Sequence, residues 1–250
     1  MSRRRQLPET GVRLRLVALV AVTAVSVTAG TAATPSASAR SQPVVRPSQE
    51  LATLLTSHQV VARLRVGGAP VGRVRASRPV TGGQTVLPVI RHTTWRGVHW
   101  LQVRIPGRPN SRKGWIRRRG TVETTTGWHL VVRTSLRRVL VYRRGRLVRT
   151  FSAIVGKPST PTPHGHFFVE ESVRMLPGSA GAPFALALSA RSNVLQEFEG
   201  GPGQIALHGL GGVGGTPGTA VSHGCVRLAN RNIGWLAARI PPGVTVSIRR

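Results

Sequence analysis

A short polar stretch near the C-terminus, residues 221–228, contains the only cysteine of this 250-residue chain. Its sequence is Val-Ser-His-Gly-Cys-Val-Arg-Leu, so Cys225 stands between His223 and Arg227. A second histidine, His208, lies 17 positions upstream of the cysteine. A thiol becomes a strong nucleophile when a neighbouring base or cation favours the thiolate, and imidazole and guanidinium groups supply both. These residue types at this spacing indicate nucleophilic catalysis by Cys225.

The same cysteine has an alternative interpretation as an inert core residue, because a thiol packs like a small apolar side chain. It cannot form a disulfide within the chain, since it has no second cysteine to pair with. Its neighbours Ser222, His223 and Arg227 are polar, which is unusual around a core residue. They favour the reactive thiol.

The charge of the chain restricts the possible function classes. Lys and Arg total 36 against 7 acidic residues, all of them Glu, which gives a formal net charge of +29. The absence of Asp excludes Asp-based metal cages, EF-hands and a Ser-His-Asp triad. The positive excess predicts attraction to polyanions, which include an anionic cell envelope, acidic glycopolymers and nucleic acid.

Residues 1–39 have the layout of a secretory signal peptide. Arginines come first, an apolar run follows from Leu16 to about Ala29, and small residues end the segment at Ala37-Ser38-Ala39. A membrane anchor is the alternative, but about 14 apolar residues are fewer than the roughly 20 that span a bilayer. We expect export to the cell wall or extracellular face, with membrane attachment only through an uncleaved segment. Export disfavours a nucleic-acid partner.

Three further regions follow in the chain. Residues 40–58 are rich in Pro and Ser and are predicted to be a linker. Residues 59–120 contain short alternating runs separated by Gly and Pro, which predict a small all-β barrel. The sequence around Trp100–Ile116 resembles the bacterial SH3-like modules of cell-wall proteins. Residues 121–250 continue as strands, with one or two short helices expected.

The elements around Cys225 can be predicted from local sequence. Residues 204–208 form an apolar strand that ends at His208, and a loop with five glycines follows over residues 210–220. Asn230 is predicted to cap a helix that runs from Arg231 to about Arg239 and stops before Pro241. The last strand is expected over residues 244–248.

Two other patterns leave alternatives open. His164 and His166 could ligate a metal, but no third ligand stands at a recognisable spacing, so we predict no metal site. Arginines alternate with apolar residues over 138–149. They are either the solvated face of a sheet, which we favour, or a dedicated polyanion site.

The region from about Gly127 to the C-terminus resembles the L,D-transpeptidase catalytic domain, the YkuD family. Four features occur in the order typical of that family: an opening hairpin, the Thr-Pro-Thr-Pro-x-Gly-x-Phe loop of residues 160–167, the Leu-His-Gly of residues 207–209, and the Ser-His-Gly-Cys-Val-Arg-Leu of residues 222–228. The implied chain is mostly β: a small SH3-like barrel, then a β-rich catalytic domain.

The resemblance implies a role for each residue of the motifs. Cys225 would be the nucleophile and His208 the general base, oriented by the carbonyl of Gly209. The residues expected to shape the oxyanion and substrate pocket are His223, Gly224 and Arg227, with Ser222 in a structural hydrogen bond. The amides around Cys225 are additionally expected to bind a developing oxyanion.

The implied reaction is a two-step acyl transfer between peptidoglycan stem peptides, through a thioester on Cys225 that yields 3→3 crosslinks. No metal or cofactor is needed, and carbapenem β-lactams are expected to acylate the thiol. Two alternatives stay open: an L,D-carboxypeptidase, in which water takes the acyl group, and a non-catalytic cell-wall-binding protein.

Overall fold

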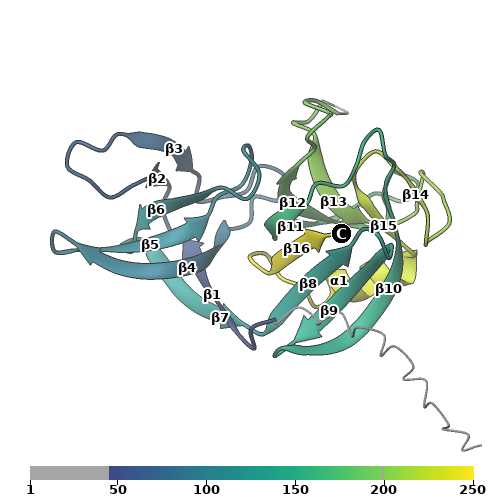
Figure 1. Ribbon diagram of the computed structural model, residues 1–250, viewed down its shortest axis with the longest axis horizontal. Helices are drawn as coiled ribbons and strands as arrows, with labels where there is room; N and C mark the ends of the chain where they lie inside the picture. The colour runs from purple at the N-terminus through teal and green to yellow at the C-terminus, as the bar shows by residue number, and fades with distance from the viewer. Residues whose placement is uncertain (1–44, 199) are drawn as a thin grey trace, which may run out of the picture. The chain divides into compact units, whose positions relative to one another are not determined.

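The computed structural model describes residues 45–198 and 200–250 (Figure 1). The predicted signal peptide therefore lies outside the described residues. Within them the chain forms sixteen strands and one short helix, arranged as a seven-stranded and a nine-stranded sheet. The prediction of a mostly β chain with one or two short helices is confirmed. Among the described residues, the helix is not long and apolar enough to cross a membrane.

The N-terminal sheet has the strand order β3-β2-β6-β5-β4-β1-β7. Its strands are β1 Gln49–Leu54, β2 His58–Val61, β3 Pro70–Val74, β4 Val86–Trp95, β5 Val98–Arg104, β6 Lys113–Arg117 and β7 Thr121–Thr126. Alternation along β5 turns Leu101 and Val103 inward, where they pack with Leu54, Leu87 and Ile116. Fully burying such a side chain contributes about 1.5–3 kcal/mol. The sheet therefore has a hydrophobic cluster separate from that of the C-terminal sheet, to which Phe168 from the later part of the chain also contributes.

The boundaries of this sheet differ from the predicted ones. β1 falls within residues 40–58, which were predicted to be a linker, and β7 falls after residue 120. The two strands pair antiparallel over six residues, from Gln49↔Thr126 to Leu54↔Thr121. β1 buries Leu51, Ala52 and Leu54, so its apolar residues do not alternate strictly. Because of this, and because Pro and Ser are frequent in residues 40–58, the sequence pattern did not predict the strand. The SH3-like character of residues 59–120 stays a prediction.

The C-terminal sheet has the order β14-β10-β15-β13-β12-β11-β16-β8-β9. Because β9 also pairs with β10, the sheet closes into a barrel (Figure 1). Its strands are β8 Trp128–Arg133, β9 Arg138–Arg143, β10 Arg146–Gly156, β11 Gly165–Arg174, β12 Phe184–Arg191, β13 Gln204–His208, β14 Ala220–Ser222, β15 Val226–Leu228 and β16 Thr245–Arg249, with the helix α1 at Asn230–Ala237 between the last two.

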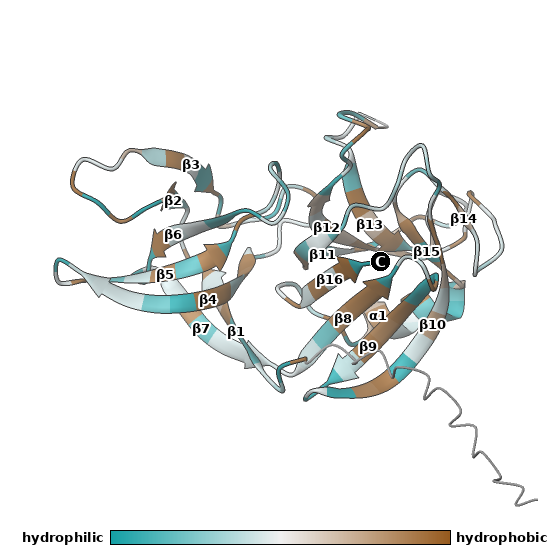
Figure 2. Cartoon of the chain, viewed as in Figure 1, coloured by the Kyte–Doolittle hydropathy of each residue, from teal (hydrophilic) through white to brown (hydrophobic). Residues whose placement is uncertain are grey.

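The barrel is filled by apolar side chains from nearly every strand. Phe167, Leu186 and Leu207 are fully buried, and Ile233 and Leu236 of α1 pack into the same cluster. Figure 2 shows the apolar residues concentrated along β8, β9 and β16. The core therefore occupies one face of β13 and β15, and the polar side chains of these strands must lie on the other face.

A half-buried histidine, His129, lies on β8, next to the closing strand β16. His129 Nε2 lies 3.1 Å from Ser247 Oγ, and His166 Nδ1 lies 3.3 Å from the same hydroxyl. Burial, together with Arg249, His166 and Arg104, lowers the pKa of His129 from 6.5 to about 4. The pKa of His166 is lowered in the same direction, mainly by burial. Both rings are therefore neutral at pH 7.

Replacing His129 is expected to make the fold less sensitive to acid. The unfolded chain protonates His129 near pH 6.5, whereas the folded protein resists protonation until about pH 4, so acid favours unfolding across this interval. The shift corresponds to roughly 3 kcal/mol of unfolding free energy lost by pH 4. Urea unfolding at pH 7.5 and 4.5 should show a smaller loss for His129→Gln than for the wild type. The exposed His99→Gln is the control, and equal losses in all three proteins would contradict the assignment.

Candidate active site

The site depends on two short strands that the chain brings side by side. β13 and β15 run parallel, with Leu207 opposite Val226 and His208 opposite Arg227. Cys225 immediately precedes β15. The glycine-rich loop and β14 form the connection between the two strands. This connection lets the chain re-enter the sheet so that β15 runs parallel to β13.

The pleat of these strands separates core residues from site residues. Ile205, Leu207, Val226 and Leu228 are at most 2% exposed and belong to the barrel core. The residues in alternate positions are half-buried: Ala206, His208, Cys225 and Arg227. Since successive side chains of a strand point to opposite faces, the imidazole and the thiol emerge on the same face of the sheet. The parallel register therefore places His208 and Cys225, the pair proposed from the sequence, on one face of adjacent strands.

The His208 ring has a defined orientation. Its Nδ1 lies 2.8 Å from the carbonyl oxygen of Gly209. A carbonyl only accepts hydrogen bonds, so Nδ1 carries the proton in the neutral ring and Nε2 carries the lone pair. This is the contact expected from the family resemblance, and it leaves Nε2 as the basic nitrogen.

A loop that the sequence did not single out supports His208. Gly181 packs against the ring, where a Cβ would lie 3.0 Å from Nδ1. The Gly209 amide donates to the Gly181 carbonyl at 2.9 Å, and a side chain at Gly209 would collide with the carbonyl of Ala182. Residues 178–183 are rich in Gly and Ala, which reads as an ordinary loop in the sequence, so only the three-dimensional contact identifies them.

The turn before Cys225 is fixed by Ser222. The fully buried Ser222 hydroxyl donates to the Cys225 carbonyl at 2.6 Å and accepts the Gly224 amide at 3.2 Å. Gly224 has a φ of 120°, a conformation that favours glycine. The Gly224 amide was among the donors expected for an oxyanion, but here it is engaged inside the turn. The Cys225 thiol lies 3.9 Å from the Gln204 carbonyl on β13.

Two threonines of the proline-rich loop hold the same turn from the other side. The Thr162 hydroxyl donates to the Gly224 carbonyl at 2.8 Å and accepts the Gly156 amide at 2.9 Å. The Thr160 hydroxyl donates to the Ser222 carbonyl at 3.2 Å. Because Pro161 has no amide hydrogen, the threonine side chains supply the hydrogen bonds that the loop backbone lacks.

The remaining pocket residues of the prediction have different environments. His223 is exposed and stacks on Phe198, with ring centroids 5.8 Å apart and planes inclined by 28°. Arg227 Nη1 donates to the Val213 carbonyl at 3.3 Å and so ties the glycine-rich loop to β15. Phe198 was not predicted, because its loop has no sequence pattern that points to the site.

Asn230 differs from the sequence prediction. The helix begins at Asn230 itself, its N-cap is Ala229, and it ends at Ala237 instead of about Arg239. The Asn230 side chain makes no cap hydrogen bond; its Oδ1 accepts the amide of Leu210 at 2.8 Å. It therefore anchors the glycine-rich loop next to His208.

The histidine pair of the proline-rich loop contacts separate partners. His164 Nε2 lies 2.9 Å from Thr134 Oγ1, whereas His166 shares Ser247 with His129. In the part of the chain that the structure describes, no group of three or more His, Cys, Asp or Glu could hold a metal ion.

Thr162→Val should weaken the turn that carries Cys225. The substitution keeps the shape but leaves the buried Gly224 carbonyl and the part-buried Gly156 amide without their partner, which costs about 1–3 kcal/mol of unfolding free energy. Denaturant unfolding measures this loss. The control is Thr219→Val, whose hydroxyl bonds Thr216 in an exposed loop and whose removal should cost no more than about 0.5 kcal/mol. Equal effects at the two positions would count against the assigned role of Thr162.

Comparisons with known proteins relate the part of the chain that contains this face to a known family. The L,D-transpeptidase catalytic domain family, YkuD, matches residues 127–248. The YkuD protein of Bacillus licheniformis is 32% identical over 124 residues, which are 50% of this chain and 67% of the relative. The YkuD protein of Bacillus subtilis is 29% identical over 126 residues, which are 50% of this chain and 68% of the relative.

Solved structures of L,D-transpeptidases are also similar to this chain. One from Mycobacterium smegmatis has a TM-score of 0.38 at 19% identity, covering 66% of this chain and 99% of that one. L,D-transpeptidase 3 from Mycobacterium tuberculosis has a TM-score of 0.44 at 16% identity, covering 79% and 97%. The relative of Bacillus licheniformis, together with the family match over residues 127–248, which contain His208 and Cys225, shows that this chain belongs to the YkuD family of L,D-transpeptidase catalytic domains.

Proposed function

We propose that this chain is an exported enzyme that forms 3→3 crosslinks in peptidoglycan through a thioester on Cys225. The observation that carries the proposal is the placement of Cys225 and His208 on one face of two parallel strands, with Nδ1 of His208 directed to the Gly209 carbonyl. A nucleophile beside a base that is itself oriented by a third group is the arrangement needed for covalent acyl transfer.

In the first step the Cys225 thiol transfers its proton to Nε2 of His208 and attacks the carbonyl of the third residue of a donor tetrapeptide stem. A C–S bond forms and the C–N bond to the terminal D-Ala breaks. The proton passes from His208 to the leaving amine, which departs as D-Ala. His208 acts first as base and then as acid.

In the second step the side-chain amine of a neighbouring stem attacks the thioester. The new amide forms as the C–S bond breaks, and the proton lost by the amine returns to the thiol through His208. Water in place of the amine would make the protein an L,D-carboxypeptidase. The two outcomes share every residue of the site, so they differ only in the acceptor.

β-Lactams that resemble the donor stem are proposed to acylate the same thiol. The L,D-transpeptidase LdtMt1 has been solved in complex with imipenem, and the M. tuberculosis L,D-transpeptidase 3 with a faropenem-derived adduct. We extend this chemistry to Cys225 on the basis of the family membership and the geometry of the site.

Cys225→Ala should abolish D-Ala release from purified tetrapeptide stems and the mass increase that a carbapenem produces. Each readout requires the thiol, whereas sedimentation with sacculi should stay unchanged. Intact-mass spectrometry and muropeptide analysis measure these effects, and the muropeptides distinguish crosslinked from trimmed products. D-Ala release by the Cys225→Ala variant would disprove the mechanism. A wild type that only sediments with sacculi would favour the non-catalytic binder.

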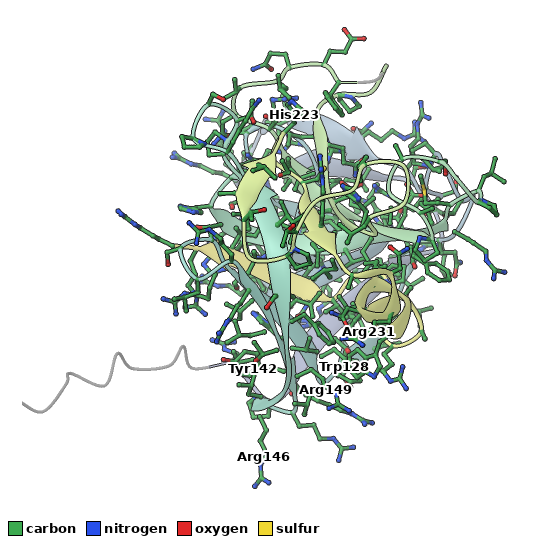
Figure 3. All side chains as sticks on the ribbon, turned by 90° about the vertical axis from the view of Figure 1, so that its right-hand side faces the viewer. Trp128, Tyr142, Arg146, Arg149, His223 and Arg231 are labelled. Atoms are coloured by element: carbon green, nitrogen blue, oxygen red, sulfur yellow. The ribbon has the colours of Figure 1, made fainter. Side chains whose placement is uncertain are left out.

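A second role, binding to anionic wall polymers, is favoured by a surface that we call the Trp–Arg surface, formed by Trp128, Trp235, Arg143, Arg149 and Arg239. These residues and Val148 line a depression of about 540 Å³. The two indoles meet edge to face at 6.1 Å, with planes inclined by 87°. Figure 3 shows Trp128 and Arg149 together at the lower end of the view and His223 at the upper end.

The arginines of the Trp–Arg surface are held in place by the indoles. The guanidinium of Arg143 lies 5.1 Å from the Trp128 ring centroid, and that of Arg239 lies 4.5 Å from the Trp235 centroid. A guanidinium that uses its face for the ring keeps its edge for phosphate or carboxylate oxygens. None of the ion pairs among residues 45–198 and 200–250 involves these arginines. This arrangement favours a polyanion site over the merely solvated sheet face.

Replacing Arg143 and Arg239 together by Gln should reduce binding to sacculi that retain their phosphate polymers. Losing two charge-assisted contacts is expected to lower the affinity by roughly tenfold or more. The matched control replaces the exposed Arg73 and Arg75 by Gln. Sedimentation at rising salt measures the binding, and indistinguishable curves for the two double variants would assign the attraction to net charge alone.

A further inference from the structure

A loop of the N-terminal sheet reaches across to a loop of the catalytic barrel. The first loop, residues 105–112, connects β5 to β6, and the second, residues 192–203, connects β12 to β13. Arg108 Nη2 donates to the carbonyls of Ser192 at 2.8 Å and Leu195 at 3.0 Å, and Nη1 donates to Pro202 at 3.0 Å. One guanidinium therefore binds both ends of the second loop.

Asn110 fixes the position from which Arg108 reaches. Its Nδ2 donates to the Arg191 carbonyl at 2.7 Å, and its Oδ1 accepts the Arg191 amide at 2.9 Å. The Gly107 amide donates to the Ser189 carbonyl at 3.2 Å. The loop of residues 105–112 is thus attached to the end of β12 on both sides of Arg108.

A buried ion cluster joins the loop between β3 and β4 to β11 of the barrel. Glu170 and Glu171 on β11 are 1% and 3% exposed. Arg78, in the loop between β3 and β4, pairs with Glu170 and lies 3.8 Å from Glu171, and Arg191 pairs with Glu170 at 3.1 Å. The amide and hydroxyl of Thr81 both donate to Glu171 at 2.8 Å. Buried carboxylates need such partners. The ion cluster therefore limits movement between the two parts of the chain that the Arg108 contact joins.

The loop of residues 192–203 borders the catalytic face at two points. Phe198 stacks on His223, two residues before the nucleophile. Gln204, the residue that directly follows the loop, presents its carbonyl 3.9 Å from the Cys225 thiol. Gly203 closes the loop at a φ of 61°, and a Cβ there would lie 3.3 Å from Arg108 Nη2. The position of Arg108 therefore determines the position of the loop that carries Phe198.

We propose that Arg108 is a positioning residue, which fixes the loop of residues 192–203 so that Phe198 and His223 form one wall of the pocket for the stem peptide. The inference rests on the proposed function for the identity of the substrate. It concerns binding of the stem and not the thiol chemistry, because Arg108 contacts only backbone carbonyls of the loop. A planar guanidinium can satisfy three carbonyls at once, whereas an ammonium cannot match that geometry.

The test compares full-length wild type with Arg108→Ala, Arg108→Lys and the control Arg91→Ala, an exposed arginine on β4. For D-Ala release from tetrapeptide stems, Arg108→Ala should raise KM roughly tenfold with little change in kcat, since a displaced wall removes contacts that bind the stem without taking part in the thiol chemistry. Arg108→Lys should fall between it and the wild type. The rate of Cys225 alkylation by iodoacetamide should match that of Arg91→Ala, although the thermal midpoint should fall because three carbonyls lose their donor. An unchanged KM would overturn the proposal, and a loss of alkylation would assign Arg108 a purely structural role.

A second measurement separates this inference from the proposed function. The ring of Phe198 shifts the NMR signals of the stacked His223 imidazole. These signals are assigned as the ones that disappear in His223→Gln. In Arg108→Ala the His223 signals should move toward those of Phe198→Leu, whether or not the protein releases D-Ala. His223 signals that stay at the wild-type position would overturn the positioning role. Failure of the wild type to release D-Ala would overturn the proposed function alone.

Discussion

The parallel pairing of β13 with β15 is the constraint on which the site depends. It sets Leu207 beside Val226 in the core and leaves His208 and Cys225 on the opposite face. A shift of the register by one residue would turn the apolar side chains outward and the reactive ones inward, because strand side chains alternate. The burial of Ile205, Leu207, Val226 and Leu228 thus stabilises the barrel and the catalytic arrangement together.

The groups that orient that pair are neutral. With no Asp in the chain, the His208 ring is oriented by a backbone carbonyl, and the cysteine turn is held by the hydroxyls of Ser222, Thr160 and Thr162. A carboxylate beside the ring would stabilise the imidazolium, whereas a carbonyl mainly selects the tautomer. The site therefore achieves orientation without adding negative charge next to a thiolate.

Local patterns were sufficient for the parts of the fold that local sequence controls. The unique cysteine, the apolar strand ending at His208 and the glycine-rich loop are all visible in the sequence. β1 was missed because its pairing with β7 joins residues more than 60 positions apart, and Asn230 was misassigned because its tertiary contact with Leu210 replaces a local cap. The support from residues 178–183 and from Arg108 consists of backbone contacts, which leave no periodic signature.

The two buried glutamates of β11 have a consequence for how this protein can be divided. The family domain begins at residue 127, but the counter-ion of Glu170 and the hydrogen-bond donors of Glu171 include Arg78 and Thr81, which lie in the earlier loop between β3 and β4. Removing one partner of a buried pair costs about 3–5 kcal/mol, a large share of the stability of a typical domain. The catalytic module is thus a unit of homology without being a unit of stability, and recombination at its boundary would carry a thermodynamic penalty unless the glutamates changed as well.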